Sequence, residues 1–274
     1  MPPSKLHRAT VVLHENAGKG YFRIVLKVPG LAAQAKPGHF VMLRVSENRD
    51  PLLARPFGIA SVKAKQSIEL YYRVVGRGTT LLTTVEQGAA LDLLGPIGKG
   101  FPVPETGTTP VFVAGGSGFP PLLFFAAALR GQGHLFIGAR DKECLPPQRA
   151  IKSCRELSAK VHVATDDGSA GKKGFVTDLL TSFLDAQKGR ARFTIYAVGP
   201  RAMMAAVNTI AAERGIPCFV SMEERMACGL GVCMGCSVPM KAGGYKRVCK
   251  EGPVFAGRDI DWSEQVVLPV PHKK

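Results

Sequence analysis

The sequence predicts an N-terminal antiparallel β barrel, a central α/β domain with an open parallel sheet, and a small cysteine-rich C-terminal domain. Three observations support this fold class. Apolar residues recur with period two from residue 9 to about residue 100, apolar runs then alternate with helix-length segments, and four of the seven cysteines lie within residues 228–249. We expect domain limits of 1–104, 108–221 and 222–274.

The barrel prediction depends on short β-rich runs separated by Gly, Pro, Asn and Asp. Most of these runs have no helix-length segment between them, which favours a closed antiparallel barrel over a helix-covered sheet. One short helix fits at 79–88. The six runs span residues 9–16, 21–30, 39–47, 55–64, 67–76 and 90–98.

The character of the chain changes after the Pro-, Gly- and Thr-rich linker at 102–110. Apolar runs at 111–116, 134–140, 160–168, 192–200 and 218–223 then alternate with predicted helices at 120–130, 148–158, 174–187 and 201–215. Such a βα repeat predicts an open parallel sheet with helices on both faces.

The formal net charge of +15 raises the question of an anionic partner. Because no basic run exceeds three residues, we do not expect a nucleic-acid site. The charge fits anionic cofactors or an acidic protein, and a host-wide basic bias explains it equally well. The chain shows no signal-peptide pattern, and its longest apolar run, 119–129, is too short for a membrane span. We therefore expect a cytoplasmic protein.

A glycine-rich turn follows the first predicted strand of the α/β domain. Gly115, Gly116 and Gly118 precede a helix, an arrangement that suits either a nucleotide pyrophosphate or a plain tight turn. Ligands of open α/β sheets bind at the carboxyl ends of the strands, where this chain also has Asp141, Asp166, Gly199 and Pro200. Asp141 could accept a hydrogen bond from a ribose hydroxyl of NAD, although either aspartate could instead cap a helix or form a turn.

The C-terminal cysteines have the spacing C-x4-C-x2-C-x12-C, formed by Cys228, Cys233, Cys236 and Cys249. The first three match the loop of plant-type 2Fe-2S proteins, whereas zinc ribbons more often pair two C-x2-C knuckles. From spacing alone, a 2Fe-2S cluster, a zinc ion and no metal all remain open. We expect the isolated Cys144, Cys154 and Cys218 to be small core residues.

The segments "RPFGIAS", "GGSGFPP" and "AVGP", in this order, resemble the ferredoxin–NADP reductase superfamily. The resemblance implies an FAD-binding barrel followed by an NAD-binding domain. Arg55, Pro56, Phe57 and Gly58 match the first flavin segment, in which Arg55 would bind the FAD diphosphate. The segment "YYRVVGRGTTLL" resembles the second flavin segment and contributes Tyr72, Arg73, Gly76, Gly78, Thr79 and Thr80.

The segments "EERMACGLGVCMGCSVP" and "YKRVCKEGPVF" resemble the electron-transfer subunits of NAD-linked dihydroorotate dehydrogenases. This resemblance implies that the four cysteines bind a 2Fe-2S cluster. It also implies an FMN-containing catalytic subunit as partner, in a heterotetramer of two copies of each, and a role in pyrimidine (UMP) biosynthesis. The expected oxidoreductase subunit carries no catalytic acid, base or nucleophile of its own. The alternative is an equivalent subunit of a sulfide dehydrogenase, a hydrogenase or an NADH-dependent ferredoxin:NADP+ oxidoreductase.

Two positions depart from the superfamily pattern. Gly58 replaces a Ser or Thr, so a hydroxyl contact to the flavin would have to come from elsewhere, such as the backbone or Ser61. Val198 replaces the cysteine of a Cys-Gly-Pro motif, so the thiol that accompanies the nicotinamide in such proteins is missing.

Overall fold

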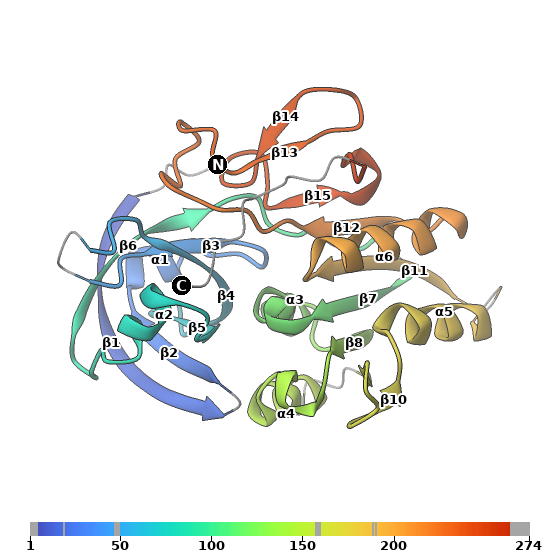
Figure 1. Cartoon of the computed structure of the whole chain (residues 1–274), viewed down its shortest axis with the longest axis horizontal. Helices are drawn as coiled ribbons and strands as arrows, with labels where there is room; N and C mark the ends of the chain where they lie inside the picture. The colour runs from blue at the N-terminus through green and yellow to red at the C-terminus, as the bar shows by residue number, and fades with distance from the viewer. Residues whose placement is uncertain are drawn as a thin grey trace, which may run out of the picture.

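The computed structural model describes residues 5–18, 20–46, 50–156, 160–187, 189 and 191–263. The barrel lies beside the α/β sheet, and the cysteine-rich segment, orange to red at the top of the view, lies along both (Figure 1). Within the described residues, no helix combines the length and the apolar character that crossing a membrane requires.

The N-terminal barrel is closed and antiparallel, as the sequence predicts, with strand order β1-β2-β5-β4-β3-β6. The predicted short helix is present as α2 (Arg77–Leu82), whereas α1 (Pro29–Ala32) was not predicted. Alternating side chains fill the interior, among them Ile24, Leu26 and Val41. The strands are β1 (Lys5–Gly18), β2 (Tyr21–Lys27), β3 (Phe40–Leu43), β4 (Arg55–Lys63), β5 (Ser67–Arg73) and β6 (Ala90–Ile97).

The central domain contains the predicted parallel sheet, extended by two further strands to the order β10-β9-β8-β7-β11-β12-β15. Its strands are β7 (Thr108–Gly115), β8 (His134–Ala139), β9 (Lys160–Thr165), β10 (Lys172–Lys173), β11 (Arg192–Val198), β12 (Cys218–Ser221) and β15 (Val254–Ala256). Its helices are α3 (Phe119–Ala128), α4 (Gln148–Glu156), α5 (Val176–Ala186) and α6 (Arg201–Glu213). Two 3₁₀ turns in this domain span Gly116–Gly118 and Lys142–Cys144, and a third, Gly257–Asp259, follows β15.

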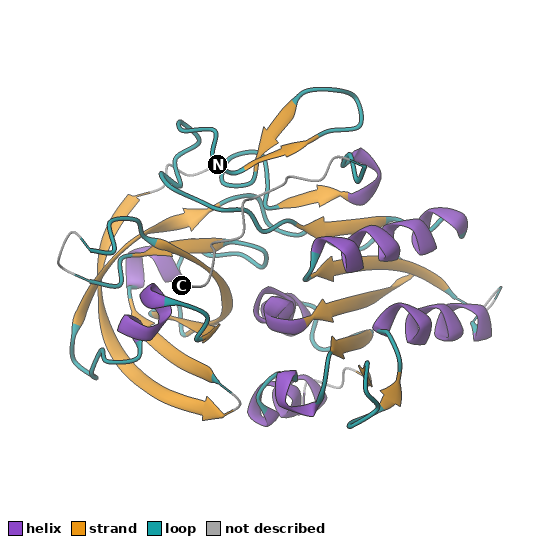
Figure 2. Cartoon of the chain, viewed as in Figure 1, coloured by secondary structure: helices purple, strands orange, loops and turns teal. Residues whose placement is uncertain are grey.

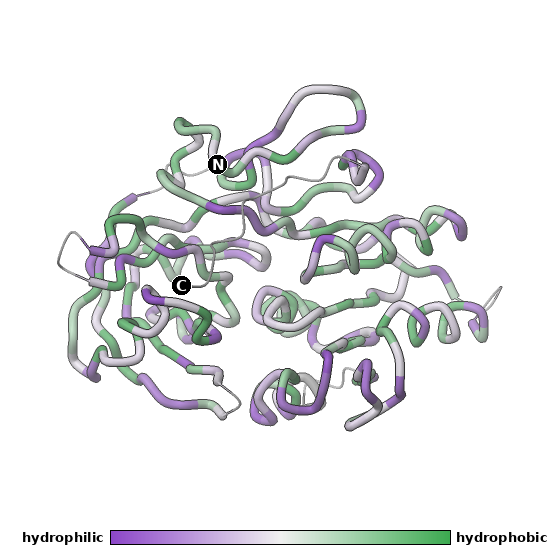
Figure 3. Tube along the Cα trace, viewed as in Figure 1, coloured by the Kyte–Doolittle hydropathy of each residue, from purple (hydrophilic) through white to green (hydrophobic). Residues whose placement is uncertain are grey.

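Helices cover both faces of this sheet (Figure 2). Successive residues of β7 point to opposite faces, so that Val111 and Val113 pack with α5 and α6, while Phe112 and Ala114 pack with α3 and α4. The central strands therefore consist mainly of apolar residues, which Figure 3 shows as green segments. This double burial fixes the carboxyl ends of the strands, where a ligand site is expected.

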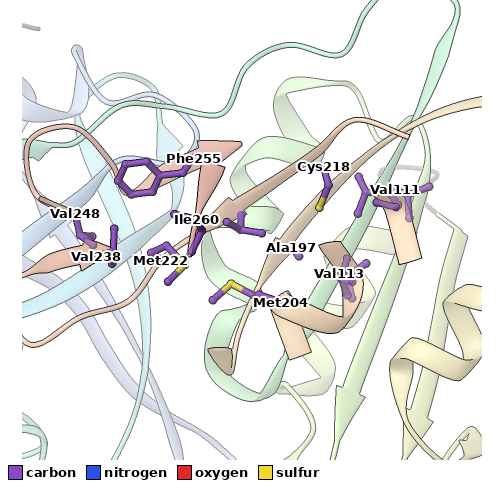
Figure 4. Close-up of a cluster of buried hydrophobic side chains, with 14 of the residues drawn as sticks. Val111, Val113, Ala197, Met204, Cys218, Met222, Val238, Val248, Phe255 and Ile260 are labelled. Carbon is purple, nitrogen blue, oxygen red and sulfur yellow. The ribbon is translucent and has the colours of Figure 1, made fainter. Parts of the chain in front are cut away.

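The cysteine-rich segment does not form a core of its own. It contains the small hairpin of β13 (Ser237–Pro239) and β14 (Tyr245–Arg247), and its last strand, β15, pairs antiparallel with β12 of the central sheet. One continuous apolar cluster runs from Val111 and Val113 to Val238, Val248 and Phe255 (Figure 4). This shared core holds the segment firmly against the α/β domain.

The isolated cysteines are partly accounted for. Cys144 and Cys218 are buried in two different apolar clusters, as expected for small core residues. The side chain of Cys154 lies outside the described part of the structure.

Candidate functional site

A cavity of about 610 Å³ lies where the barrel, the α/β sheet and the cysteine-rich segment meet. Its volume is within the roughly 300–1,000 Å³ typical of small-molecule sites. Residues of β4, of the segment from β5 to α2, and of the loop before α3 line it. The predicted flavin residues that line this cavity are Arg55, Pro56, Phe57, Gly58, Tyr72, Arg73, Gly76, Gly78 and Thr79.

Arg55 lies against the first turn of α2. A Cβ atom at position 78 would lie 2.7 Å from the Nε atom of Arg55, so only glycine allows this approach. The Arg55 guanidinium also donates a hydrogen bond to the carbonyl of Leu53. The residue type and its place on the cavity wall suit the recognition of a diphosphate, because a guanidinium presents several N–H donors in a planar fork.

The two threonines of α2 serve mainly to build the turn. The Thr79 hydroxyl accepts hydrogen bonds from the N–H groups of Val75, at 2.9 Å, and Gly76, at 3.1 Å, and donates to the Gly76 carbonyl. Thr80 also donates to the Gly76 carbonyl and does not belong to the cavity lining. Thr79 therefore occupies the N–H groups of Val75 and Gly76 within the turn and fixes the start of α2 on the cavity wall.

Tyr72 and Arg73 are fixed by contacts on either side of the cavity. The Tyr72 hydroxyl is 2.9 Å from Nε2 of His14, and its ring stacks on Phe22 with a centroid distance of 5.5 Å. Burial raises the pKa of Tyr72, so the hydroxyl keeps its proton. The Arg73 guanidinium lies 3.7 Å from the sulfur of Cys144 and therefore connects the barrel with the α/β domain.

Packing explains why position 58 is a glycine, which the sequence alone does not reveal. A Cβ atom at this position would lie 3.0 Å from Cγ of Pro121, which belongs to the first turn of α3. The alternative donor suggested above, Ser61, donates its hydroxyl hydrogen to Glu69 at 2.6 Å and does not line the cavity. The hydroxyl expected from the superfamily is thus not supplied by Ser61.

The glycines of the loop after β7 pack mainly against protein. A Cβ atom at Gly118 would lie 2.4 Å from the carbonyl oxygen of Val198, and one at Gly115 would lie 2.7 Å from Cδ of Pro200. Gly199, with a φ of +154°, packs against Gly115 in turn. These small residues let the loops after β7 and β11 touch. Gly116, with a φ of +54° and open space around its Cα, has room for a ligand to approach.

The two predicted aspartates lie at the carboxyl edge of the sheet but outside the cavity lining. The Asp141 carboxylate accepts a hydrogen bond of 2.8 Å from the N–H of Cys144 and caps the short turn after β8, which lowers its pKa. Asp166 is exposed at the end of β9. The capping role, which the sequence left open, is therefore present at Asp141.

The cysteine loop brings the four thiols together as two pairs. The sulfur atoms of Cys236 and Cys249 are 3.3 Å apart, and the thiol of Cys233 lies near that of Cys228, where it helps to lower the pKa of Cys228. In the described residues, no three side chains converge as they would around a single metal ion. A 2Fe-2S cluster takes two protein ligands on each iron, so two thiol pairs fit its donor geometry better than that of a zinc ion.

Backbone N–H groups of the cysteine loop point at the sulfur of Cys228. Burial raises the pKa of the Cys228 thiol, but N–H groups of Cys233, Leu230 and Val232 outweigh that effect and lower it to about 6. The Leu230 nitrogen lies 3.3 Å from the sulfur. Gly229 and Gly231 both have positive φ, which lets the chain fold around the sulfur atoms. Cys249 is buried, and burial raises its pKa to about 12.

Several cavity residues were not predicted. The loop after β12 contributes Glu223 and Glu224, and the residue immediately before β3 contributes the buried side chain of His39. Glu223 is exposed, whereas burial and the nearby Lys36 lower the pKa of His39 to about 4. The position of Glu223 at the carboxyl end of the last parallel strand was a usable signal, because ligands bind at this edge.

The cavity and the thiol pairs adjoin each other. Met226, two residues before Cys228, and Val248, immediately before Cys249, both line the cavity. The guanidiniums of Arg55 and Arg73 and the flat side chains of Phe57 and Tyr72 fit the diphosphate and the ring system of a flavin nucleotide. The site therefore combines residues that fit a flavin with residues that fit an iron–sulfur cluster.

Comparison with known protein families gives two matches. Residues 223–261 match the family described as the iron-sulfur cluster binding domain of dihydroorotate dehydrogenase B. Residues 112–209 match the family described as the oxidoreductase NAD-binding domain.

A solved structure of an NADH-dependent reduced ferredoxin-NADP oxidoreductase is similar over 96% of this chain and 92% of that chain, with 30% identity and a TM-score of 0.81. The ferredoxin NADP+ reductase of Neisseria gonorrhoeae, solved with bound FAD and NADP, shares the fold over 77% of this chain and 92% of its own. Its TM-score is 0.63 at 18% identity.

Two curated relatives are named as the electron transfer subunit of dihydroorotate dehydrogenase B (NAD(+)). The protein of Desulforamulus reducens is 37% identical over 94% of this chain and 99% of its own length. The protein of Geobacillus thermodenitrificans is 36% identical over 92% of this chain and 97% of its own. Given this similarity over nearly the whole length, the chain belongs to the family of dihydroorotate dehydrogenase B electron transfer subunits.

Proposed function

We propose that this chain transfers electrons between NAD(H) and the catalytic subunit of an NAD-linked dihydroorotate dehydrogenase, in pyrimidine biosynthesis. One observation carries the proposal: Met226 and Val248, next to the cysteine ligands, also line the flavin-type cavity. This adjacency supports direct electron exchange between the two sites. The partner is the FMN-containing catalytic subunit, in a heterotetramer of two copies of each, and the location is the cytoplasm, where cysteine ligands stay reduced.

The proposed division of roles follows the geometry. Arg55 binds the FAD diphosphate, Phe57 and Tyr72 flank the ring system, and the first turn of α2, at 77–79, supplies N–H donors. NAD(H) binds at the carboxyl edge of the sheet, near Gly116 and Val198. Bound FAD supplies hydride chemistry toward the nicotinamide and single-electron chemistry toward the cluster. The chain therefore needs to position these groups rather than to provide an acid or base.

The same proposal assigns the two thiol pairs to the two irons of a 2Fe-2S cluster. Cys228 and Cys233 would hold one iron, and Cys236 and Cys249 the other, since Cys236 and Cys249 already lie in contact and Cys233 lies near Cys228. The N–H groups directed at Cys228 stabilise the thiolate form that a metal requires.

Substitution of one cysteine tests the cluster. We expect anaerobically purified Cys233→Ser to lose most of its iron while its bound flavin is still reduced by NADH, because Cys233 does not line the flavin cavity. The matched control is Cys218→Ala, which removes a buried thiol of the central sheet and should keep its iron. Iron content equal to that of the unmodified protein in Cys233→Ser would refute the ligand assignment.

Substitution of Arg55 tests the flavin site. Arg55→Ala should weaken FAD binding by about ten- to a hundredfold, since hydrogen bonds to charged groups are worth roughly 1.5–3 kcal/mol. The measurement is a titration of the flavin-free chain with FAD, followed by flavin fluorescence. Arg192→Ala, at an exposed arginine paired with Glu105 outside the cavity, is the control. An unchanged dissociation constant for Arg55→Ala would contradict the assignment.

The complete function is tested by reconstitution. The chain is coexpressed with the FMN subunit, and NAD+ reduction by dihydroorotate is followed in the purified complex. We expect activity from the complex and none from this chain alone. A complex that forms with full cofactor content yet fails to reduce NAD+ would exclude the proposed role.

A further inference from the structure

The segment "KRVCKEGPVF" contains an ion pair that the cofactor assignments above do not use. Arg247 ends the small hairpin strand β14, and Glu251 lies in the turn that follows Cys249. The guanidinium of Arg247 donates through Nε to Oε2 of Glu251 at 3.0 Å and through a second nitrogen to Oε1. The backbone N–H of Arg247 donates to the same carboxylate at 2.8 Å. This two-point contact fixes the guanidinium in one orientation.

The remaining guanidinium nitrogen reaches the cysteine loop. Nη1 of Arg247 lies 2.5 Å from the carbonyl oxygen of Gly231, which sits between Cys228 and Cys233. The two partners of the ion pair are only partly exposed, with 23% and 28% of their side-chain surfaces accessible. The ion pair is therefore better shielded from solvent than an exposed one. Through Arg247, the segment around Cys249 is connected to the loop between Cys228 and Cys233.

The position of the Gly231 carbonyl determines where the next N–H group points. In a trans peptide the C=O and the N–H point in opposite directions, so a carbonyl held by Arg247 directs the N–H of Val232 away from Arg247. That N–H faces the sulfur of Cys228 from the same loop as the N–H of Leu230, whose nitrogen lies 3.3 Å from this sulfur. Arg247 thus acts on Cys228 through a single peptide unit.

We propose that Arg247, held by Glu251, is a positioning residue for the iron–sulfur cluster and raises its reduction potential. This inference rests on the cluster assignment of the proposed function and adds to it the residue pair that tunes the site. Hydrogen bonds to the sulfur atoms and nearby positive charge both favour the reduced, more negative cluster. Arg247 supplies the charge directly and the hydrogen bond through Val232.

The test is a reduction potential, which a purely structural role would leave unchanged. The full chain, with its flavin and cluster, is titrated anaerobically, and the signal of the reduced cluster is followed by electron paramagnetic resonance. We expect a more negative potential in Arg247→Gln, and a smaller shift of the same sign in Arg247→Lys, which keeps the charge but loses the planar fork that holds the Gly231 carbonyl and the Glu251 carboxylate together. Lys246→Gln removes one charge from the exposed neighbouring position and should leave the potential unchanged.

Iron content separates the possible failures. If the unmodified protein contains no cluster, the proposed function itself is wrong. If the Arg247 variants contain the full amount of iron and have the same reduction potential as Lys246→Gln, only the inference about Arg247 is wrong. Loss of iron from Arg247→Gln alone would support the positioning role. In that event the potential of Arg247→Lys decides the tuning, by the same comparison with Lys246→Gln.

Discussion

At the scale of single residues, Gly58 and Pro121 show how one contact can exclude a side chain that a family pattern favours. Gly58 departs from the superfamily pattern of the flavin segment, and Pro121 lies in the first turn of α3, after the glycine-rich loop. The structure places the two in contact, with Pro121 occupying the space that a side chain at 58 would need. The two positions are therefore coupled, because a side chain at 58 requires Pro121 to shift by a few tenths of an ångström.

This coupling gives a stability prediction. Gly58→Ser should lower the free energy of unfolding by about 1–3 kcal/mol, the usual cost of adding atoms to a well-packed interface. Gly58→Ser combined with Pro121→Ala should recover part of that loss. Denaturant unfolding of the single and double variants measures both effects. Equal stabilities of Gly58→Ser and the unmodified protein would show that the proline moves aside without cost.

Residue types predicted the chemistry of the site better than its details. Cysteine spacing identified the four thiols, because ligand spacing is a local property of the chain. The glycines at 115, 118 and 199 looked like ligand contacts but pack two loops together, and this depends on tertiary structure. His39 was missed because nothing in its neighbours along the sequence indicates that it is buried at a cavity.

At the scale of elements, strands β8 and β9 place two histidines side by side. Nδ1 of His134 lies 3.0 Å from Nε2 of His162, and the two rings stack together and contact Phe183 of α5. Burial, the neighbouring His162 and Lys160 lower the pKa of His134 to about 4, and burial and Lys160 also lower that of His162. Both rings are therefore neutral in the folded protein near pH 7.

The folded state is expected to lose stability on acidification because of this pair. As pH falls below about 6.5, the unfolded chain binds protons that the folded pair resists down to about pH 4, so protons favour unfolding across this window. The stabilisation is complete above pH 6.5, and its loss amounts to about 1–2 kcal/mol near pH 5 after allowance for partial exposure.

A comparison of unfolding free energies at pH 7 and pH 5 measures the effect. The difference should shrink in the double variant His134→Gln, His162→Gln, while carboxylates elsewhere contribute equally to both proteins. An identical pH dependence in the two proteins would show that the pair does not resist protonation.

The elements found from sequence are those with a local periodic pattern. All six barrel strands and five strands of the central sheet have one, and each was predicted close to its observed bounds. By contrast, β10 consists of Lys172 and Lys173 and carries no apolar signal. Strand β15 has three residues, and its place in the sheet is set by a pairing with β12 that lies far away along the chain.

At the scale of the whole molecule, the cysteine loop also forms an exposed apolar surface. Leu230, Val232 and Met234 alternate along the loop between the ligands, with 55%, 78% and 49% of their surfaces accessible. Exposed apolar side chains that cluster in this way commonly mark a protein contact. Because electrons must leave the cluster for the catalytic subunit, we propose that this loop docks against that subunit.

Matched substitutions test the docking surface. Val232→Asp should weaken the complex with the catalytic subunit at least tenfold, since a carboxylate would have to be desolvated at the contact. Val103→Asp, at a comparably exposed valine (75%) in the linker before β7, should leave the affinity unchanged. Affinity is measured by calorimetry, with iron and flavin content checked in each variant. Equal affinities for the two variants would place the interface elsewhere.

Strand β15 has a consequence for engineering the molecule. Because β15 forms the edge strand of the nucleotide-binding sheet, the cysteine-rich segment cannot be removed as an independent domain. Its removal would leave the hydrogen-bonding groups of β12 exposed, an edge prone to self-association. A chimera that carries this redox module into another reductase therefore has to bring a compatible β12 edge with it.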